Sequence, residues 1–449
     1  MKLIPTITIP IGEYLYVYPK IRLGKQNLMK LDKIGKLFYE NLKQYMDDST
    51  AIENITKVFI NADVEKIKID YNAFKNKLKK AGFLIDNNDI NVVSEENNSI
   101  SEERYVQELL NIQQTFTQER KPYKFFIELT YNCNLRCAHC YREEEIRENY
   151  QEYLEKEKIY SVLDEIEEIG AVEVVFTGGE CFTHPKIYEI LEYATKKNLI
   201  VTILTNGNFI DEITIEKLQK IDIYDIRVSI YGMQEKHDFM THIQGSWKKS
   251  VRALELIKEK KGIGTAVFVI TKNNYEDTED VIEFFRQKDI SLSLNTMITP
   301  TAKGKLNPTE MRINSKEYEE LLNKYNLPVS GSRCTAGISR FRIIPNGNVI
   351  PCELIEGNVL GNIYAQSIKE IMEGEKKKYF EEAFSSILKT HYCVTQCEYK
   401  SVCNFCPAIF LIENNDINKP VKYICDMSKI KKEHLRKRGI RGKENGKML

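Results

Sequence analysis

Residues 124–141 read KFFIELTYNCNLRCAHCY, and the organisation of the chain can be worked out from this segment. Its first part, Phe125–Leu129, is a short apolar run of the kind that forms a buried strand. The loop that follows carries three cysteines, Cys133, Cys137 and Cys140. Thiolates are soft ligands that suit zinc and iron–sulfur clusters. Three of them leave one metal position open, which a catalytic site needs and a structural site avoids.

Further along the chain, short β-branched runs alternate with amphipathic segments of helical periodicity. The strands are expected at Phe125–Leu129, Val172–Phe176, Ile200–Leu204, Ile226–Ile230, Ala266–Ile270 and Ser291–Asn295. Six βα units of this size predict an α/β fold with a parallel sheet bent into a partial (β/α)6 barrel. Because functional residues of such folds lie at the carboxyl ends of the strands, Gly178-Gly179-Glu180 and Thr205-Asn206-Gly207 are expected beside the cysteine loop.

The overall composition is that of an ordinary soluble protein. Among 449 residues, 65 Lys and Arg balance 65 Asp and Glu, which argues against a positive field suited to nucleic acid. No run of about 18 apolar residues is present, so no transmembrane helix is expected. Pro5, Pro10 and Glu13 interrupt the segment where a secretory signal would be apolar, and we therefore expect a cytoplasmic protein. In that reducing compartment, eleven cysteines indicate metal or redox chemistry rather than disulfides.

The chain is expected to contain five parts. Residues 1–90 combine a β-rich start with three helical stretches, as in a winged-helix-like module. Residues 91–120 are typical of a polar linker that ends in a helix, and residues 121–325 make the partial barrel. Residues 326–428 form a loop-rich, cysteine-rich domain. Residues 429–449 hold nine Lys and Arg against two Glu, which predicts a solvated basic tail.

Two interpretations of the cysteine loop follow from its neighbours. One is a structural zinc site with His139 as the fourth ligand, although the adjacent His139 and Cys140 cannot easily both turn toward one ion. The other uses Gly178-Gly179-Glu180 on the next βα loop. Its glycines leave backbone groups accessible, and a carboxylate beside a cluster can hold an ammonium group. The presence of both motifs on neighbouring loops favours this second interpretation.

These two motifs resemble those of the radical S-adenosylmethionine (SAM) enzymes: CNLRCAHCY is similar to their cluster motif, and Gly-Gly-Glu to their SAM-ammonium motif. The resemblance implies a 4Fe–4S cluster on the three cysteines of the loop, with SAM at the open iron. It also implies a 5′-deoxyadenosyl radical that takes a hydrogen atom from the substrate. The residues given SAM-binding roles by this resemblance are Tyr141, Gly178, Gly179, Glu180, Asn206 and Ser229. For Tyr141, Asn206 and Ser229, an ordinary role at a strand end is the alternative.

Seven further cysteines lie between residues 334 and 425. An Asn346-Gly347 turn between two β-branched runs predicts a hairpin that brings Cys334 and Cys352 near each other. Two structural zinc ions are one interpretation of this set. The layout also resembles the SPASM extension of radical SAM enzymes, which carries two auxiliary 4Fe–4S clusters. The central spacing is x3, x5, x2 here instead of the usual x2, x5, x3.

By order along the chain, the SPASM resemblance implies two groups of ligands. The three-thiol group is Cys334, Cys352 and Cys406, and the four-thiol group is Cys393, Cys397, Cys403 and Cys425. Residues 326–333 lack the additional cysteine found in relatives with a fully ligated first auxiliary cluster. The cluster on the three-thiol group would therefore have an open iron, able to bind a substrate cysteine thiolate. With the cluster on the cysteine loop, the resemblance implies three 4Fe–4S clusters in all.

One cysteine, Cys181 beside Glu180, belongs to none of these groups. A lone cysteine usually packs as a small hydrophobic residue. The alternative is a catalytic role as a hydrogen-atom donor near SAM.

The N-terminal module resembles the RiPP recognition element, a PqqD-like domain of enzymes that modify ribosomally made peptides, in size, position and helix pattern. This resemblance implies that a leader peptide binds by strand addition to an exposed sheet edge. The net charge of +6 over residues 1–85 would also suit a DNA-binding winged helix. However, Arg22 is the only arginine before Arg104, so no arginine-rich recognition helix is present.

The order of module, barrel and SPASM domain resembles sactipeptide and ranthipeptide maturases, such as that of subtilosin A. The implied function is formation of an intramolecular thioether, from a cysteine sulfur to a carbon, in a precursor peptide. A ferredoxin or flavodoxin would supply electrons, and no nucleic-acid or membrane partner is expected. Carbon–carbon crosslinking and epimerisation are alternatives within the same chemistry, whereas sulfatase maturation would not need the N-terminal module. A metal-cluster DNA-binding regulator is the alternative from another class.

Overall fold

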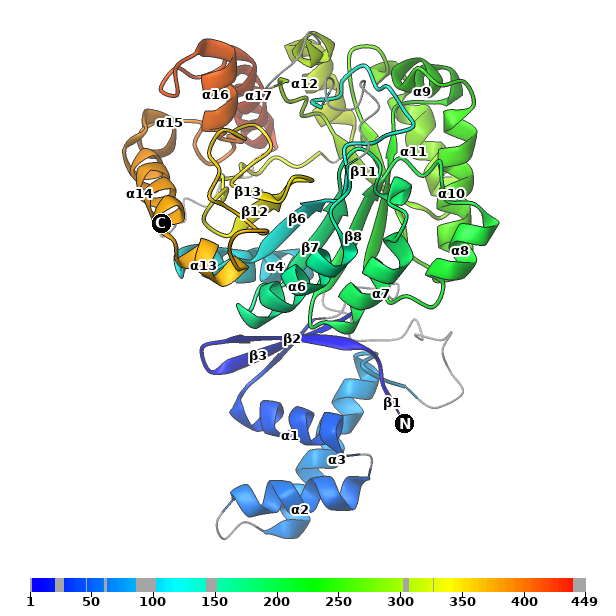
Figure 1. Ribbon diagram of the computed structural model, residues 1–449, viewed down its shortest axis with the longest axis vertical. Helices are drawn as coiled ribbons and strands as arrows, with labels where there is room; N and C mark the ends of the chain where they lie inside the picture. Colours follow the sequence, from blue (N-terminus) through cyan, green and yellow to red (C-terminus); the bar gives the residue numbers. More distant parts are fainter. Residues whose placement is uncertain are drawn as a thin grey trace.

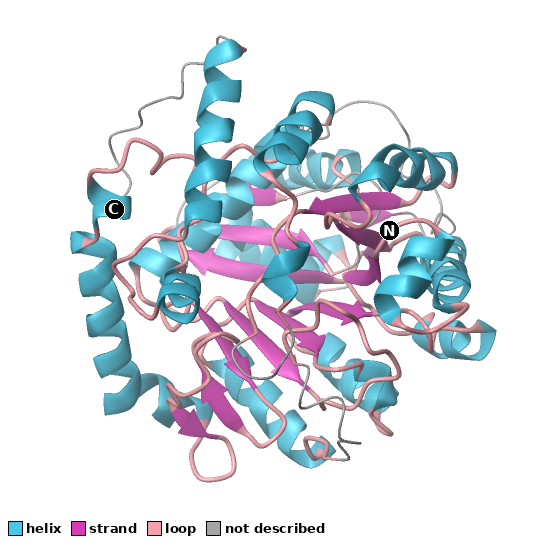
Figure 2. Cartoon of the chain, turned by 90° about the horizontal axis from the view of Figure 1, so that it is seen from above, coloured by secondary structure: helices cyan, strands magenta, loops and turns pink. Residues whose placement is uncertain are grey.

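The computed structural model describes residues 2–20, 28–45, 47–59, 63–85, 102–142, 152–301, 307–325 and 327–438. A curved sheet lies at the centre of the molecule, with helices along its outer side and a small N-terminal module beneath it (Figure 1). Seen from above, the helices surround the strands (Figure 2).

Six neighbouring parallel strands form the barrel part of the sheet. In spatial order they are β6 (Lys124–Glu128), β7 (Glu173–Thr177), β8 (Ile200–Thr205), β9 (Asp225–Ile230), β10 (Thr265–Val269) and β11 (Ser291–Asn295). The helices of these units are α6 (Lys156–Glu168), α7 (Ile187–Lys196), α8 (Glu212–Leu218), α9 (Gln234–Thr241), α10 (Ser246–Lys261) and α11 (Thr278–Gln287). The partial (β/α)6 barrel predicted from the sequence is confirmed. The short helix α9 was not expected.

Burial on both faces explains why the central strands are so apolar. Every residue of β7 is buried, including the continuous run Val174-Val175-Phe176. Such runs are typical of parallel sheets that are covered by helices on one side and closed around a core on the other. The edge strand β11 alternates exposed and half-buried residues, because only one neighbour, β10, pairs with it.

The sheet does not end at β6. Strand β12 (Arg340–Ile343) pairs with β6 in parallel, and β13 (Asn348–Ile350) and β14 (Gly361–Asn362) continue it as antiparallel strands. The turn between β12 and β13 has Gly347 at φ +83°, a left-handed conformation that favours glycine. The predicted Asn346-Gly347 hairpin is therefore confirmed, and the C-terminal region shares one sheet with the barrel.

The C-terminal region is more helical than expected. Its helices are α12 (Ser315–Lys324), α13 (Ile368–Glu373), α14 (Glu375–Thr390), α15 (Tyr392–Thr395), α16 (Pro407–Asn414) and α17 (Lys422–Lys437). The expected boundary of the basic tail at residue 429 falls inside α17, where Ile430, Lys431 and His434 are buried. The expectation of a solvated tail is thus wrong for residues 429–437, because one face of this basic helix packs on the protein. Residues 439–449 lie outside the described residues.

The N-terminal module combines three helices with short strands. The helices are α1 (Lys33–Gln44), α2 (Asp48–Val58) and α3 (Val64–Lys80). The strands are β2 (Thr6–Ile11), β3 (Tyr14–Pro19) and β4 (Met29–Leu31), which form one antiparallel sheet, and β1 (Lys2–Leu3) paired with β5 (Leu84–Ile85).

This module packs against the amino ends of the barrel strands. The residues of the shared hydrophobic cluster are Ile7, Ile9, Tyr16, Tyr18, Leu28, Ile112, Phe116, Tyr123, Val172 and Ile200. Two of them, Ile112 and Phe116, belong to α4 (Glu102–Gln118), the helix expected at the end of the linker. The backbone N–H and C=O of Thr8 on β2 also bond the side-chain amide of Asn198, at 3.0 and 2.9 Å. The module therefore lies opposite the carboxyl ends, where the site is expected.

Among the described residues, no helix combines the length and the apolar character needed to cross a membrane.

The continuity of the sheet can be tested at Phe341. Its ring stacks on Phe125 with centroids 5.4 Å apart, and both side chains are fully buried. We expect Phe341→Ala to lower the free energy of unfolding by about 3–5 kcal/mol. The single tryptophan, Trp247, lies in α10 of the barrel, so the urea midpoint of its fluorescence reports the barrel. Phe239→Ala, at a side chain 62% exposed, is the control and should barely move that midpoint. An unchanged midpoint in Phe341→Ala would mean that β12 is not an integral strand of the barrel sheet.

Candidate active site

The cysteine loop, residues 129–142, follows β6 and is hydrogen-bonded to the C-terminal end of α9. The backbone N–H of Arg136 donates to the Thr241 carbonyl at 3.1 Å, and that of Ala138 to the Met240 carbonyl at 2.9 Å. These bonds attach the loop to the end of a helix. Burial raises the pKa of Cys133 to about 12 and also raises that of Cys137, with the neighbouring Cys140 thiol acting in the same direction on both. The three thiols are therefore neighbours at the carboxyl end of β6.

Gly178 and Gly179 allow the next loop to touch the cysteine loop backbone to backbone. The N–H of Gly179 donates to the Thr130 carbonyl, and that of Glu180 to the Asn132 carbonyl, each at 2.8 Å. A Cβ atom on Gly178, which has φ +133°, would lie 2.2 Å from the Thr130 oxygen. On Gly179 it would lie 2.3 Å from the Tyr131 oxygen. Because those neighbours are backbone atoms, no larger residue fits without moving the loop.

The Glu180 carboxylate is buried and surrounded by donors from its own chain. One oxygen accepts from the Thr205 hydroxyl at 2.8 Å and the Phe182 N–H at 3.1 Å, and the other from the Asn206 N–H at 2.7 Å. Burial raises the pKa of Glu180. The carboxylate thus ties the end of β7 to the end of β8. A role in binding an ammonium group would have to share this carboxylate with those donors.

Cys181 opens a short 3-10 turn and points into the core. Its thiol lies 3.6 Å from the Glu180 carboxylate and 3.5 Å from the Leu204 carbonyl, and the side chain is fully buried in the barrel core. Burial, reinforced by the Glu180 charge, raises the pKa of Cys181 well above its usual value. The described contacts are those of a packed thiol that supports Glu180.

The other predicted SAM-binding residues take different positions. Asn206 reaches the cysteine loop, since its side-chain N–H donates to the side-chain Oδ1 of Asn134 at 2.8 Å and lies 3.9 Å from the Cys133 sulfur. Ser229 is half-buried and is the last residue but one of β9. Tyr231 follows directly after this strand. Tyr141 lies beside Arg142, with its ring centroid 5.3 Å from the guanidinium carbon, and burial raises its pKa to about 12.

Tyr231 is a residue that the sequence reasoning did not assign to the site. Burial raises the pKa of its hydroxyl well above the usual value, with the Cys137 thiol acting in the same direction, and the centroid of its ring lies 4.6 Å from that of the His139 ring. The His237 ring accepts from its N–H at 3.2 Å, and the Asn274 amide donates to its carbonyl at 3.0 Å. Its position directly after β9, at the carboxyl end of a strand, is the signal that would have found it.

The seven C-terminal cysteines fall into two groups according to which thiols raise one another's pKa. Burial raises the pKa of Cys393 to about 12, and the thiols of Cys397, Cys403 and Cys425 add to this effect. In the other group, Cys334 acts in the same way on Cys352 and on Cys406, whose pKa is about 11. These effects connect Cys334 with Cys352 and Cys406, and Cys393 with the other three thiols, while members of both groups pack in one hydrophobic cluster.

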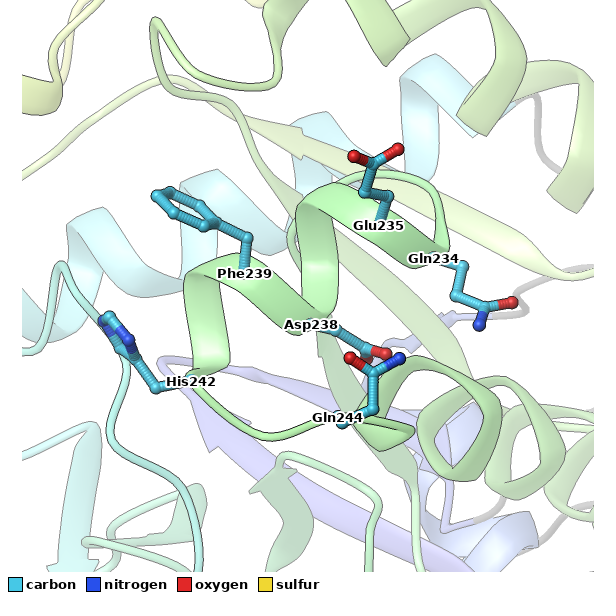
Figure 3. Close-up of a pocket in the computed structure, with 6 residues that line it drawn as sticks. All are labelled: Gln234, Glu235, Asp238, Phe239, His242 and Gln244. Atoms are coloured by element: carbon cyan, nitrogen blue, oxygen red, sulfur yellow. The ribbon is translucent and has the colours of Figure 1, made fainter.

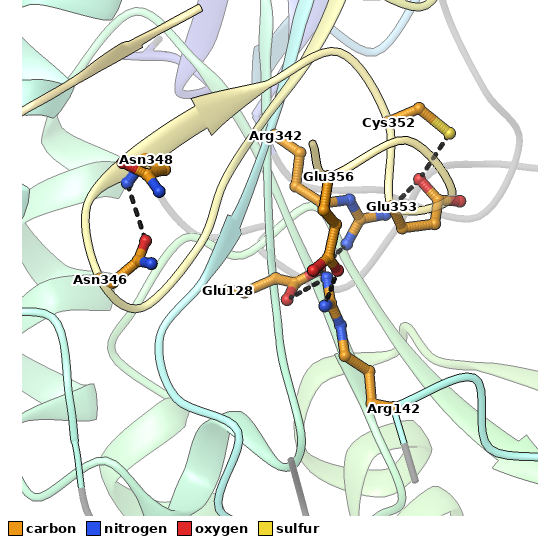
Figure 4. Close-up of polar contacts among 8 residues, drawn as sticks. All are labelled: Glu128, Arg142, Arg342, Asn346, Asn348, Cys352, Glu353 and Glu356. Carbon is orange, nitrogen blue, oxygen red and sulfur yellow. Dashed lines mark hydrogen bonds and ion pairs between the residues drawn. The ribbon is translucent and has the colours of Figure 1, made fainter. Parts of the chain in front are cut away.

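A buried ionic bridge joins the cysteine loop to the three-thiol group (Figure 4). It consists of Glu128, Arg142, Arg342, Glu353 and Glu356. Arg142, directly after the loop, pairs with Glu128 at 3.0 Å and with Glu356. Arg342 on β12 pairs with the same Glu128 and, at 3.1 Å, with Glu353. The Cys352 thiol donates to Glu353 at 3.3 Å, which completes the connection.

The outer side of α9 carries an open hollow of about 600 Å³. Its lining residues are Gln234, Glu235, Asp238, Phe239, His242 and Gln244 (Figure 3). The Asp238 carboxylate accepts hydrogen bonds from the N–H groups of Gly245 and Trp247, at 2.7 and 2.8 Å, and from the Ser246 hydroxyl.

The residues present fit an iron–sulfur cluster with SAM. The donor set is soft and contains three thiols on one loop, and a glycine pair keeps the adjoining backbone free of side chains. In the part of the chain that the structure describes, no three His, Cys, Asp or Glu side chains are arranged to hold a single metal ion. Because the thiols have raised pKa values, ligation would have to release their protons.

Two family models match the chain. The radical SAM superfamily model matches residues 127–285, and SPASM, an iron–sulfur cluster-binding domain, matches residues 334–407. The chain therefore contains a radical SAM core followed by a SPASM domain.

Relatives of known function differ in what they make. The subtilosin biosynthesis protein AlbA of Bacillus subtilis is 27% identical over 324 residues, which cover 67% of this chain and 70% of AlbA. An AdoMet-dependent heme synthase of Oleidesulfovibrio alaskensis is 25% identical over 321 residues, 63% of this chain and 81% of the synthase. Streptococcus suis SuiB, solved with its precursor peptide SuiA, matches with a TM-score of 0.57 at 16% identity, covering 95% of this chain and all of SuiB. The shared feature is the radical SAM fold.

The glycine contact predicts a sharp effect on SAM binding. We expect Gly179→Ala to abolish it, because the added methyl group would meet two backbone carbonyls and displace the cysteine loop. Gly357→Ala is the matched control, since a Cβ there has no heavy atom within 4 Å and Gly357 has no positive φ. SAM affinity of the reconstituted proteins, measured by anaerobic calorimetry, decides the matter. Equal affinity in both variants would exclude this loop contact as a requirement for binding.

Proposed function

We propose that this radical SAM enzyme matures a ribosomally made peptide by forming a thioether between a cysteine sulfur and a carbon of the same peptide. The observation that supports this function best is the position of the three-thiol group, which a single ionic bridge separates from the cysteine loop. A site for radical formation and a site for sulfur binding would then be neighbours.

In this proposal the cysteine loop holds a 4Fe–4S cluster on Cys133, Cys137 and Cys140. With SAM bound, this group supplies a 5′-deoxyadenosyl radical that removes hydrogen from a peptide carbon. Gly178, Gly179, Glu180 and Asn206 shape the SAM site, since the contacts above bring them to the loop. Formation of the thioether would move one hydrogen atom from the peptide carbon to the 5′-deoxyadenosyl group, release one proton from the cysteine thiol and return one electron to the enzyme, so that the cleaved SAM is the two-electron oxidant overall.

The two C-terminal cysteine groups would hold two auxiliary clusters. The four-thiol group offers a full set of ligands, whereas the three-thiol group leaves one iron without a protein thiolate. That open position is where we place the substrate cysteine. A ferredoxin or flavodoxin is the reductant in this proposal, which also places the enzyme in the cytoplasm.

The N-terminal module would bind the leader of the substrate at β4. The other edge of its sheet, β2, is occupied, because Thr8 bonds Asn198 of the barrel. In the described residues β4 pairs with β3 alone, so its second side remains for strand addition. Precursor binding by SuiB, a structural neighbour that spans this whole chain, supports a peptide partner.

The contacts of Cys181 weigh against epimerisation. An epimerase returns a hydrogen atom to carbon, and Cys181 is the spare thiol that would do so. It is fully buried and lies against Glu180 and Leu204, on the core side of the loop. Carbon–carbon crosslinking, which needs no thiol, stays the main alternative.

The decisive experiment uses the mass of the product. A cysteine-containing precursor is incubated anaerobically in D2O with the reconstituted enzyme, SAM and a reductant. We expect a loss of two hydrogen atoms per event, and no loss when the peptide thiols are alkylated beforehand. A loss that survives alkylation would establish carbon–carbon crosslinking, and a gain of one mass unit would establish epimerisation.

Two variants separate radical formation from sulfur capture. Cys133→Ala should abolish SAM cleavage altogether, because it removes a cluster ligand. Cys406→Ala should leave SAM cleavage to 5′-deoxyadenosine measurable by chromatography but stop thioether formation. Cleavage that survives in Cys133→Ala, at unchanged iron content, would end the proposed radical chemistry.

A further inference from the structure

Arg340 occupies a fixed position between the cysteines of the three-thiol group. It is the first residue of β12, six residues after Cys334 and twelve before Cys352. Its N–H donates to the Thr335 carbonyl at 3.2 Å, and its carbonyl accepts from Gly337 at 2.9 Å. On the other side, the pairing of β12 with β6 sets it beside Lys124. The backbone of Arg340 is therefore fixed by the turn after Cys334 and by the sheet.

The guanidinium group faces the thiols. One of its terminal nitrogens lies 3.9 Å from the Cys352 sulfur. Burial raises the pKa of the Cys334, Cys352 and Cys406 thiols, and the charge of Arg340 acts in the opposite direction on each of them. The cation thus lies against Cys352, and its charge lowers the pKa of the other two thiols in the same direction.

No carboxylate is paired with this cation. Among the described residues, Arg340 forms no ion pair, whereas the nearby Arg142 and Arg342 pair with Glu128, Glu353 and Glu356. Glu353, the carboxylate whose charge Arg340 feels most, pairs with Arg342 at 3.1 Å. The charge of Arg340 therefore acts both on Glu353, with which it forms no ion pair in the described residues, and on the sulfur atoms.

The four-thiol group has a different environment. Its buried cation is Lys431, which lowers the pKa of the Cys403 thiol against the effect of burial. The amine of Lys431 donates to the Val402 carbonyl at 3.4 Å. The cation at Cys425, Lys422, is exposed and paired with Asp426 at 2.6 Å. Each group thus has its own cation, which provides a matched pair of variants.

We infer that Arg340 is a positioning residue that supplies the counter-charge of the three-thiol group, so that a cluster there accepts an electron and an anionic sulfur ligand more readily. This inference rests on the proposed function for the identity of the ligand. An electron or a thiolate adds one negative charge to a partly buried site, and a nearby guanidinium stabilises that charge most where the local dielectric constant is low. No bond to Arg340 forms or breaks, and a thiol that binds releases its proton to solvent.

Redox titration of the full-length chain tests the inference. The Cys133→Ala, Cys137→Ala, Cys140→Ala background leaves iron at the auxiliary sites alone, and electron paramagnetic resonance follows their reduction. We expect Arg340→Gln to make reduction of the three-thiol cluster about tenfold less favourable, a potential lower by about 59 mV for one electron. Arg340→Lys should restore most of the potential, because it restores the charge. Lys431→Gln should shift the four-thiol cluster instead.

A second readout uses a neutral thiol probe, N-acetylcysteine amide. We expect the spectrum of the three-thiol cluster to change as the probe binds, with at least tenfold weaker binding in Arg340→Gln. If the parent protein shows no such change, the proposed capture of substrate sulfur fails. The role of Arg340 is then decided by the reduction potentials of the parent protein and Arg340→Gln alone. If the probe binds both proteins equally and the potentials agree, the role of Arg340 is overturned while the proposed function stands.

Iron and sulfide content guard against a folding defect. If Arg340→Gln does not retain its iron, Arg340→Met takes its place, because it keeps an apolar stem near the ring of Phe126. A neutral variant with full iron content and an unshifted potential overturns the inference. A lower potential at full iron content supports it, since a purely structural role would not move the potential.

Discussion

The architecture depends on one buried carboxylate, that of Glu128. Its side chain is completely buried at the end of β6, where an unpaired charge would cost several kcal/mol. Two guanidinium groups form ion pairs with this carboxylate, one from the cysteine loop and one from β12. Removing either arginine leaves Glu128 with a single partner and takes an ion-pair partner from Glu356 or Glu353. The sheet, the cysteine loop and the SPASM domain therefore have one relative arrangement that satisfies these charges together.

The barrel could be predicted because its signals are local. Short apolar strands, helical periodicity and the glycines at strand ends are all written in neighbouring residues. The pairing of β12 with β6 has no such signal, since it joins strands more than 200 residues apart. The helices between residues 368 and 437 were not predicted, because the cysteines of this region indicate metal ligation and carry no information on secondary structure. The position of the module also depends on long-range contacts, such as that of Thr8 with Asn198.

In the site, residue types were predictable and their partners were not. The cysteine loop and the Gly-Gly-Glu loop were expected beside each other, and the structure brings them into contact and explains the glycines by the carbonyls they touch. That Glu180 would be held by Thr205 and Asn206 could not be read from the motif. Nor could Arg340, because an arginine without a carboxylate partner is recognised only when its neighbours in space are known.

The place of the N-terminal module beneath the barrel sets a condition on any substrate held there. A peptide strand added to β4 is anchored at the amino ends of the barrel strands, while the cysteine loop lies at their carboxyl ends. Strands of five or six residues span about 17–20 Å. At about 3.3 Å per residue, an extended peptide needs at least five or six residues to cover that length. The distance between β4 and the cysteine loop would thus set the shortest chain length between the leader and a modified residue. Residues closer to the leader would not reach the cysteine loop.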